Sequence, residues 1–325
     1  MAIYITLDAG GSKCSAIMFD DELNILGRGL SGGVNTTQTS LEDSRANMVS
    51  CMEQMFAMLT PKCVAKLYLS FVGPVNILME EFARRTEVRE LIMLGEPKAG
   101  LLAGGLRREG MLAIAGTGSD VFYITEDGGN GARRDVVGAY GPILGDQGSG
   151  TWIGQRALRA AVKAGEGWGR ETILRDLIKE AWGVKDEWGF VDKVHGAVAP
   201  FRMVASVAPL VGKAAHMGDE VALDIMRGAG KEMALQTLCL IERVGDMPKE
   251  HRFMVACGGA WKAHPLMFET FKRMIQAQHP EVQVEKPCFE HVMCGPVDML
   301  LRAGLDEGEI LRRLRDKFAD YVIKW

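Results

Sequence analysis

The feature that most constrains this chain is a short pattern that occurs twice: an apolar strand, a glycine-rich turn and a second strand. The first copy reads ITLDAGGSKCSAIMF from residue 5, and the second reads LAIAGTGSDVFYI from residue 112. The Gly-Ser pair at 11 and 12 recurs at 118 and 119, an offset of 107 residues (118 − 11). We interpret this as an internal repeat, which predicts two related α/β domains.

The apolar and glycine-rich segments predict the same alternation of strands and helices in both parts of the chain. In the first part, strands are expected at 3–7, 14–19, 25–30, 66–72 and 91–94, and helices at 41–59, 79–85 and 98–106. The pattern restarts at residue 111, residues 150–244 are mostly helical, and later elements are expected at 253–257, 265–277, 282–284, 295–303 and 307–323. We therefore expect an N-terminal domain over 1–108 and a C-terminal domain over 109–304, with the helix in 305–325 packing back on the first domain.

Composition excludes several classes of protein. With 325 residues, 47% of them hydrophobic and 25% charged, the chain can fill two cores. The net charge of −4 and the scattered basic residues argue against a nucleic-acid partner. No apolar run reaches the roughly 18 residues that a membrane helix needs, and the start does not resemble a signal peptide, so we expect a cytoplasmic protein. The seven cysteines show no CxxC spacing, so no zinc or iron–sulfur site is expected.

The two glycine-rich turns are candidate phosphate sites. Glycines let backbone N–H groups approach an anion closely, and a hydroxyl adds a further donor. The first turn offers Gly10, Gly11 and Ser12, followed by Lys13, which either neutralises phosphate charge or is an ordinary exposed lysine. The second turn is AGTGSD, whose candidate residues are Gly116, Thr117 and Gly118.

Asp8 ends the first strand immediately before its turn. A carboxylate at this place can hold Mg²⁺ beside the phosphates, directly or through water. The alternative is that Asp8 only caps the turn.

Two further glycine-rich segments lie in the second half of the chain. YGPILGDQGSGTWIG, from residue 140, places Gly145 and Asp146 before a helix that is expected to start near Ser149. A buried Asp146 needs hydrogen-bond donors, which a ligand hydroxyl can supply, although helix capping by Asp146 or Ser149 is the alternative. CGGAW, with Gly258 and Gly259, follows a strand and is either a nucleoside contact or only a tight β–α turn. The Walker A and protein-kinase signatures are absent, and no GxGxxG motif opens the first strand and its turn.

Six segments together resemble a known family. In chain order, LDAGGSKCSA, GGVNTT, AGTGSD, YGPILGDQGSGTWIG, ACGGAW and CGPVDMLLRAG are similar to the N-acetylglucosamine kinase branch of the BadF/BadG/BcrA/BcrD ATPase family. The resemblance implies the fold of actin, sugar kinases and Hsp70: two duplicated ribonuclease-H-like domains with a nucleotide cleft between them. It also implies transfer of phosphate from Mg–ATP to an amino sugar, and a homodimer.

The resemblance also implies roles for individual residues. Ser12 and Thr117, with the other turn residues, contact the ATP phosphates, and Asp8 contacts the magnesium. Gly258 and Gly259 lie by the nucleoside. The sugar-binding residues that it implies are Asn35, Gly116, Gly145 and Asp146.

The position of the catalytic base departs from the family pattern. The family's sugar kinases carry Asn-Asp-Ala ahead of the helix that ends in LLAG, and the Asp accepts the proton of the attacking hydroxyl. Here the segment reads LGEPKAGLLAG, so that Glu96 stands in place of the Asp. Glutamate has the same acid–base chemistry with one more methylene group.

The sequence therefore leaves open which sugar is the substrate and whether the protein is a kinase. Tyr140 and Gln147 stand where the family usually has Trp and Glu, and N-acetylglucosamine, N-acetylmuramic acid and glucosamine all remain candidate sugars. One alternative to a kinase is a sensor that binds ATP and sugar without turnover. Another is an ATPase activator of the same family, although the cysteine spacing does not fit its iron–sulfur cluster.

Overall fold

The computed structural model describes residues 1–37, 39–126 and 135–325. Its contacts divide the chain into two compact units. Unit 1 consists of Met1–Arg108 and Pro287–Lys324, and unit 2 consists of Glu109–Lys286 with Trp325.

Unit 1 is built on a five-stranded sheet with strand order β3-β2-β1-β4-β5. Its strands are β1 (Ile3–Ala9), β2 (Lys13–Asp20), β3 (Ile25–Gly32), β4 (Cys63–Phe71) and β5 (Glu87–Met93). β1, β2 and β3 form an antiparallel meander, whereas β4 and β5 run parallel to β1. The parallel pairing places the carboxyl ends of β1 and β4 at one edge, where Asp8 and Ser70 are opposite each other.

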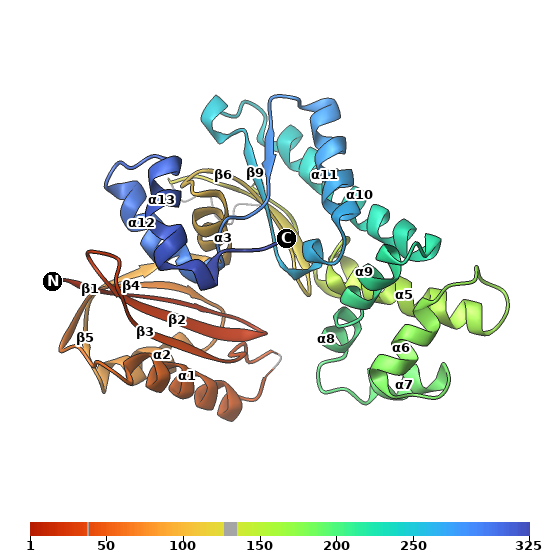
Figure 1. Ribbon diagram of the computed structural model, residues 1–325, viewed down its shortest axis with the longest axis horizontal. Coiled ribbons are helices and arrows are strands. Elements are labelled where there is room, and N and C mark those ends of the chain that lie inside the picture. Colours follow the sequence, from red (N-terminus) through yellow and green to blue (C-terminus); the bar gives the residue numbers. More distant parts are fainter. Residues whose placement is uncertain (38, 127–134) are drawn as a thin grey trace. The chain divides into compact units, whose positions relative to one another are not determined.

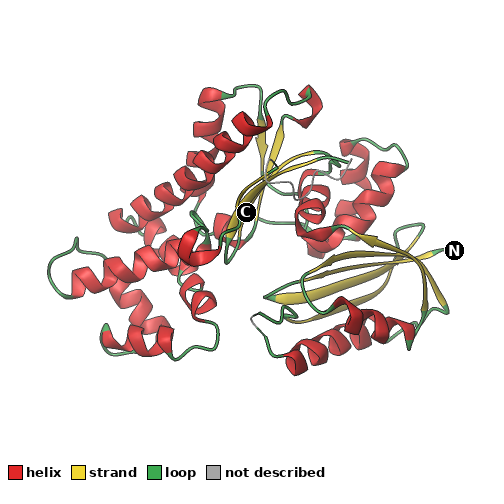
Figure 2. Cartoon of the chain, turned by 180° about the vertical axis from the view of Figure 1, so that it is seen from behind, coloured by secondary structure: helices red, strands yellow, loops and turns green. Residues whose placement is uncertain are grey.

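Helices cover both faces of this sheet (Figures 1 and 2). The helices are α1 (Leu41–Phe56), α2 (Val75–Ala83), α3 (Gly95–Gly105), α12 (Cys294–Arg302) and α13 (Glu307–Lys317). Side chains alternate across a strand, so Ala16 and Met18 of β2 enter the core shared with α1 and α2. Ile17 and Phe19 enter the second core, which α3, α12 and α13 complete.

Unit 2 contains a second five-stranded sheet, with strand order β10-β9-β6-β7-β8. Its strands are β6 (Gly110–Ala115), β7 (Ser119–Ile124), β8 (Val136–Gly138), β9 (Phe253–Cys257) and β10 (Gln283–Glu285). β6, β7 and β8 are antiparallel, and β9 and β10 run parallel to β6. Written in reverse, the order is β8-β7-β6-β9-β10, which matches the order β3-β2-β1-β4-β5 of unit 1. In this match β6 corresponds to β1 and β9 corresponds to β4.

Most of unit 2 outside this sheet is helical, as Figure 2 shows. Its helices are α4 (Gly141–Leu144), α5 (Gly150–Gly165), α6 (Leu174–Trp182), α7 (Trp188–His195), α8 (Pro200–Ala205), α9 (Ala208–His216), α10 (Glu220–Val244) and α11 (Pro265–Gln278). One large core joins the sheet to these helices through apolar residues such as Ala113, Ile153, Met233 and Phe271. The expectation of an α/β fold with two duplicated sheets is confirmed.

The two glycine-rich hairpins are equivalent in the fold but differ in length by one residue. Ala9 pairs with Cys14 across the first hairpin, whereas Ala115 pairs with Ser119 across the second. The strands before the turns therefore correspond at an offset of 106 residues (115 − 9). The Gly-Ser pairs, which lie after the extra residue, stand at an offset of 107.

The second domain boundary differs from the sequence expectation. Residues 287–304, which we expect in the second domain, belong to unit 1. The reason is apolar packing, because Val297 and Leu300 of α12 are buried in one core with Leu102 of α3. Ile310 and Leu314 of α13 enter the same core.

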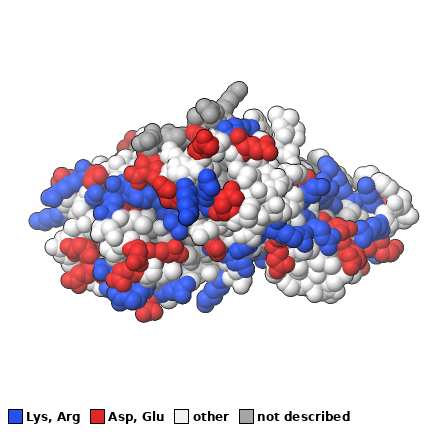
Figure 3. Space-filling view, turned by 90° about the horizontal axis from the view of Figure 1, so that it is seen from above, with Lys and Arg blue, Asp and Glu red and all other residues white. Residues whose placement is uncertain are grey.

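The surface carries mixed charge. Lys and Arg side chains are interspersed with Asp and Glu on the face that Figure 3 shows. Within the described ranges, every helix is too short or too polar to cross a lipid bilayer.

Candidate active site

The first hairpin turn is held by backbone hydrogen bonds. The Gly10 N–H donates to the Lys13 carbonyl at 3.1 Å, and the Gly10 carbonyl accepts from the N–H groups of Val34 at 2.8 Å and Asn35 at 3.2 Å. The Asn35 side chain accepts from the Thr37 N–H at 3.0 Å and the Thr37 hydroxyl at 2.9 Å. Asn35, predicted to bind sugar, is thus fixed beside the turn predicted to bind phosphate.

Asp8 lies at the end of β1 and is fixed from the neighbouring strand. The Ser70 hydroxyl donates a hydrogen bond of 2.8 Å to Asp8 Oδ1. The other carboxylate oxygen of Asp8 has lone pairs that can accept a hydrogen bond from a metal-bound water molecule. Ser70 is not among the site residues predicted from the sequence, although the strand predicted at 66–72 contains it and a parallel pairing with the first strand would place it here.

Lys13 follows the turn and forms an ion pair with Glu290, both side chains being partly exposed. From the sequence, Lys13 either binds phosphate or is an ordinary exposed lysine. In the structure its charge is compensated by a carboxylate from a segment 277 residues away, which no local sequence signal could indicate.

Glu96 lies in the first turn of α3, with its side chain exposed at the surface of unit 1. The surrounding protein atoms nevertheless reduce its hydration, and this desolvation raises the pKa of the carboxyl group. The nearby imidazole of His291 acts to lower this pKa, and the carboxylate of Asp8 acts to raise it. Unit 1 therefore brings Glu96 and Asp8 within electrostatic reach of each other, with His291 as a neighbour that the sequence did not indicate.

The second hairpin turn is joined to the start of α5. The Gly116 N–H donates to the Gly118 carbonyl at 2.9 Å, and the Gly150 N–H donates to the Gly116 carbonyl at 2.8 Å. The Thr151 hydroxyl donates to the Thr117 carbonyl at 2.7 Å. These bonds fix the turn predicted to bind phosphate against the glycine-rich segment predicted to bind sugar.

Asp146 is buried beside this turn, 7% exposed, and has a φ of 58°. Its carboxylate accepts from the Ser119 N–H at 3.3 Å. A Cβ atom at Gly118 would lie 2.9 Å from Asp146 Oδ2, so only glycine leaves space for the carboxylate there. Burial raises the pKa of Asp146, and hydrogen bonds from the backbone of Ser119 and Gly141 partly oppose this.

The capping alternative for this segment is resolved in favour of Ser149. Its hydroxyl accepts from the Trp152 N–H at 3.1 Å and so caps α5. Asp146 is therefore not the cap of this helix. Gly145 lies just before it, where its N–H donates to the Gly141 carbonyl at 2.7 Å.

Gly258 directly follows β9 and has a conformation that requires glycine. Its φ is 112°, and a Cβ atom there would lie 2.3 Å from the Ala115 carbonyl oxygen. A Cβ at Gly259 would meet no described atom within 4 Å. Gly258 and Gly259 therefore follow β9 at the sheet edge where β6 enters the second hairpin turn.

Each unit thus gathers its predicted residues at one edge of its sheet. Asp8, Gly10 and Asn35 meet in unit 1, where Glu96 approaches Asp8. Gly116, Thr117, Gly118 and Asp146 meet in unit 2. Among the described residues, no group of three His, Cys, Asp or Glu side chains could hold a metal ion on its own. A magnesium ion at Asp8 would need oxygen atoms from water and phosphate, which is how Mg²⁺ is commonly held in nucleotide sites.

Two α/β units with the same sheet order and a glycine-rich hairpin in each define the class of fold. The family model of the BadF/BadG/BcrA/BcrD ATPase family matches residues 5–292. The chain therefore belongs to this family, which confirms the resemblance that its motifs indicate.

The similar proteins include sugar kinases. An N-acetylmuramic acid/N-acetylglucosamine kinase of Clostridium acetobutylicum is 23% identical over 291 residues, which covers 87% of this chain and 94% of the relative. A glucosamine kinase of Vibrio cholerae is 22% identical over 248 residues, 74% of this chain and 81% of the relative. A solved structure from Chromobacterium violaceum, provisionally named an N-acetylglucosamine kinase, has a TM-score of 0.68 at 20% identity and covers 93% of this chain and 99% of that one.

Proposed function

We propose that this protein is an ATP-dependent carbohydrate kinase that phosphorylates an amino sugar, N-acetylglucosamine or a related N-acetylhexosamine. The observation that carries the proposal is the arrangement of Glu96 and Asp8 in unit 1. One carboxyl group has a raised pKa and suits a base, and the other is fixed by Ser70 and suits a metal-water ligand. The family membership and the kinase relatives support the same activity.

ATP would be bound by one turn from each unit. In unit 1, Gly10 and Gly11 would let the phosphates approach the backbone and Ser12 would add a hydroxyl donor, and in unit 2 Thr117 and Gly118 would contact them. Gly258 and Gly259 would let the nucleoside approach the backbone after β9. Mg²⁺ would neutralise phosphate charge, held near Asp8 through water molecules.

The sugar would be bound by Asn35, Gly116, Gly145 and Asp146. In the reaction, a sugar hydroxyl oxygen forms a bond to the γ-phosphorus of ATP while the bond from that phosphorus to the β–γ bridging oxygen breaks, and ADP leaves. Glu96 takes the hydroxyl proton. Its raised pKa makes its carboxylate a stronger base than an ordinary glutamate.

The buried Asp146 gives a reason to expect a polar sugar. Its carboxylate loses hydration in the fold and gains only weak backbone donors, so sugar hydroxyl groups would restore the missing hydrogen bonds. A site built in this way discriminates strongly against analogues that lack the hydroxyl.

The proposal also includes a cytoplasmic location, where ATP is available, and a homodimer, which the family resemblance implies. No nucleic-acid or membrane partner is part of the proposed reaction.

The test is ADP release by the purified protein with Mg–ATP under five conditions: with N-acetylglucosamine, N-acetylmuramic acid, glucosamine or glucose, and without sugar. Release that depends on one amino sugar would support the kinase and name its substrate. Release that is equal without sugar would favour an ATPase activator, and binding of ATP and sugar without release would favour a sensor.

A further inference from the structure

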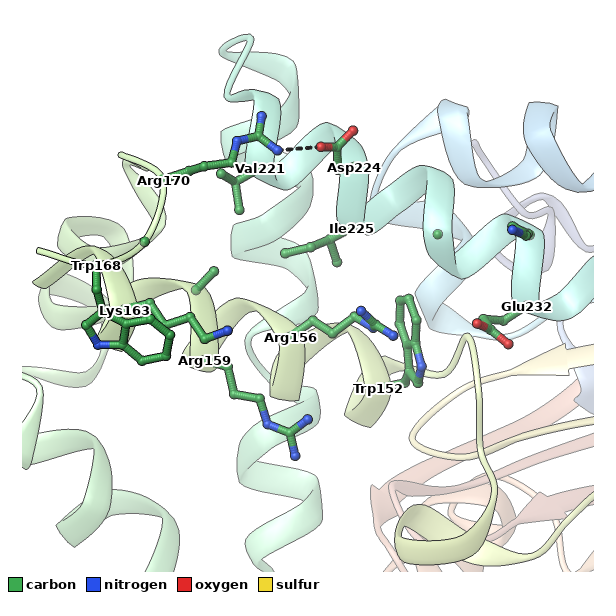
Figure 4. Close-up of a pocket in the computed structure, with 14 residues that line it drawn as sticks. Trp152, Arg156, Arg159, Lys163, Trp168, Arg170, Val221, Asp224, Ile225 and Glu232 are labelled. Carbon is green, nitrogen blue, oxygen red and sulfur yellow. Dashed lines mark hydrogen bonds and ion pairs between the residues drawn. The ribbon is translucent and has the colours of Figure 1, made fainter. Parts of the chain in front are cut away.

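A groove of about 590 Å³ lies in unit 2, away from the predicted turns, between α5, α10 and residues 168–170 (Figure 4). Its volume falls within the roughly 300–1,000 Å³ of small-molecule sites. The α5 residues follow one another at helical spacing: Trp152, Arg156, Arg159 and Lys163. None of the groove residues belongs to the set proposed for ATP or the amino sugar, so the groove has no role in the reaction above.

The groove is positively charged in a protein whose net charge is −4. Five cations line it against two acids, a difference of +3 (5 − 2): Arg156, Arg159, Lys163, Arg170 and Lys231 against Asp224 and Glu232. Asp224 is already engaged by Arg170 at 2.6 Å and by Arg227 at 2.6 Å. Among the described residues, the structure gives no ion-pair partner to Arg156, Arg159 or Lys231, so these charges are available to an anion.

Two tryptophans pre-arrange the cations. The Arg156 guanidinium lies 4.0 Å from the centre of the Trp152 ring, and the Lys163 ammonium lies 4.7 Å from that of Trp168. The Trp168 indole N–H donates to Glu166 at 2.7 Å, which orients its ring. Figure 4 shows Trp152 and Trp168 at opposite ends of the basic row. The cations therefore lose less side-chain freedom when a ligand binds.

The floor of the groove is apolar. Val221 and the buried Ile225 of α10 line it, and Ala160 and Gly228 are too small to fill it. A Cβ atom at Gly228 would lie 3.0 Å from the Trp152 ring. This floor can receive the face of a ring, while the row of cations along α5 receives negative charge.

We propose that this groove binds a small phosphorylated molecule that carries a flat ring. The phosphate would be bound by Arg156, Arg159 and Lys163, which can donate charge-assisted hydrogen bonds to it. The ring would lie over Val221 and Ile225. A small ligand is favoured over a long polyanion, because Glu232 and Glu166 place negative charge at the two ends of the row.

The test is isothermal titration calorimetry of the whole protein with 1-naphthyl phosphate, which combines a flat ring with a phosphate group. We expect saturable 1:1 binding, at least tenfold weaker binding of inorganic phosphate, and no measurable binding of 1-naphthol. The triple variant Arg156→Gln, Arg159→Gln, Lys163→Gln should bind at least tenfold more weakly. The control Lys272→Gln, Arg273→Gln removes two basic residues from α11 of the same unit and should bind like the parent protein.

A second variant tests the shape of the groove without changing its charge. Gly228→Leu fills the floor beside Trp152 and should weaken 1-naphthyl phosphate more than inorganic phosphate. Circular dichroism melting identifies any variant that fails to fold. Equal binding by the parent and the triple variant would overturn the proposal. So would tight binding of a polyglutamate peptide that depends on the three cations when 1-naphthyl phosphate does not bind.

Discussion

Asp8 and Ser70 are opposite each other on the parallel strands β1 and β4, and the Ser70 hydroxyl donates a hydrogen bond of 2.8 Å to the Asp8 carboxylate. The bond fixes one carboxylate oxygen and leaves the other for a ligand. It connects two residues that are 62 positions apart in the sequence. The proposed magnesium ligand is therefore positioned by the sheet and not by its own turn alone.

Removing each partner of this bond should have a different effect. Asp8→Asn removes the charge that Mg–ATP needs, and we expect kcat/KM for Mg–ATP to fall by about 100-fold or more. Ser70→Ala removes only the positioning bond and should cost about threefold to tenfold. Steady-state kinetics with varied Mg–ATP measures both, with the exposed Asp21→Asn as the control. Equal losses in Ser70→Ala and Asp8→Asn would contradict the assigned roles.

Glu96 should be the group on which turnover depends. A general base contributes about 100-fold to 10,000-fold to the rate, so Glu96→Gln should lower kcat by at least about 100-fold while nucleotide binding is kept. Glu96→Asp restores the residue type of the family pattern and should keep far more activity than Glu96→Gln. Glu87→Gln, at an exposed position of β5, is the matched control. Turnover by Glu96→Gln at the parent rate would exclude this base.

The pH profile should reveal the same group. The pKa of Glu96 is raised, so the rate should fall with decreasing pH at values above the ordinary glutamate range near about 4.3. His291 acts to lower the pKa of Glu96, and His291→Gln should therefore move this acidic limb to higher pH with kcat on the plateau retained. The exposed His195→Gln should leave the limb in place. If the acidic limb of His291→Gln lies at the same pH as that of the parent protein, the electrostatic interaction between His291 and Glu96 is contradicted.

Asp146 should affect both sugar use and stability. Asp146→Asn keeps an oxygen for the Ser119 N–H but loses the charge, and we expect KM for the sugar to rise by about tenfold to 100-fold. Because the pKa is raised in the fold, the folded state holds this proton longer than the unfolded state. The protonated Asp146 carboxyl group therefore contributes to stability at pH values below its pKa in the unfolded state. This contribution is lost as the pH rises through its pKa in the folded state. The melting temperature of Asp146→Asn relative to the parent should therefore increase between pH 4 and pH 7.5.

Two adjacent glycines offer a paired test of the β9 turn. In Gly258→Ala, the new alanine must adopt a positive φ, and its Cβ atom clashes with the Ala115 carbonyl oxygen. We therefore expect a loss of about 2–4 kcal/mol in the free energy of unfolding. Gly259→Ala meets no described atom and should change it by less than about 0.5 kcal/mol. Urea unfolding measures both values, and equal losses would contradict this account of the turn.

Much of the fold follows from the sequence because its signals are local. Apolar strands separated by glycine-rich turns predict both meanders, and the recurrence of AGTGS after AGGS predicts the duplicated sheet order. The Gly258 turn and the start of α5 near Ser149 are also local features. Where the signal is only apolar periodicity, the prediction is weaker. Residues 287–304 read as another helix of the second domain, but their apolar face packs with α3 in unit 1.

The site was predictable only where its residues belong to one motif. Asp8, Gly10 and Gly118 are found from their own turns. Ser70, Glu290 and His291 reach the site from distant segments, so their contribution depends on strand pairing and helix packing that no local pattern encodes. The difference of one residue between the two hairpin turns is visible only from the strand register.

The central claim is tested most directly by identifying the product. The protein is incubated with Mg–ATP and N-acetylglucosamine, N-acetylmuramic acid or glucosamine, and the sugars are analysed by mass spectrometry with Glu96→Gln in parallel. We predict a sugar that gains one phosphate group, in an amount equal to the ADP formed, and that is absent with Glu96→Gln. ADP formed together with inorganic phosphate and no phosphorylated sugar would contradict the proposed kinase.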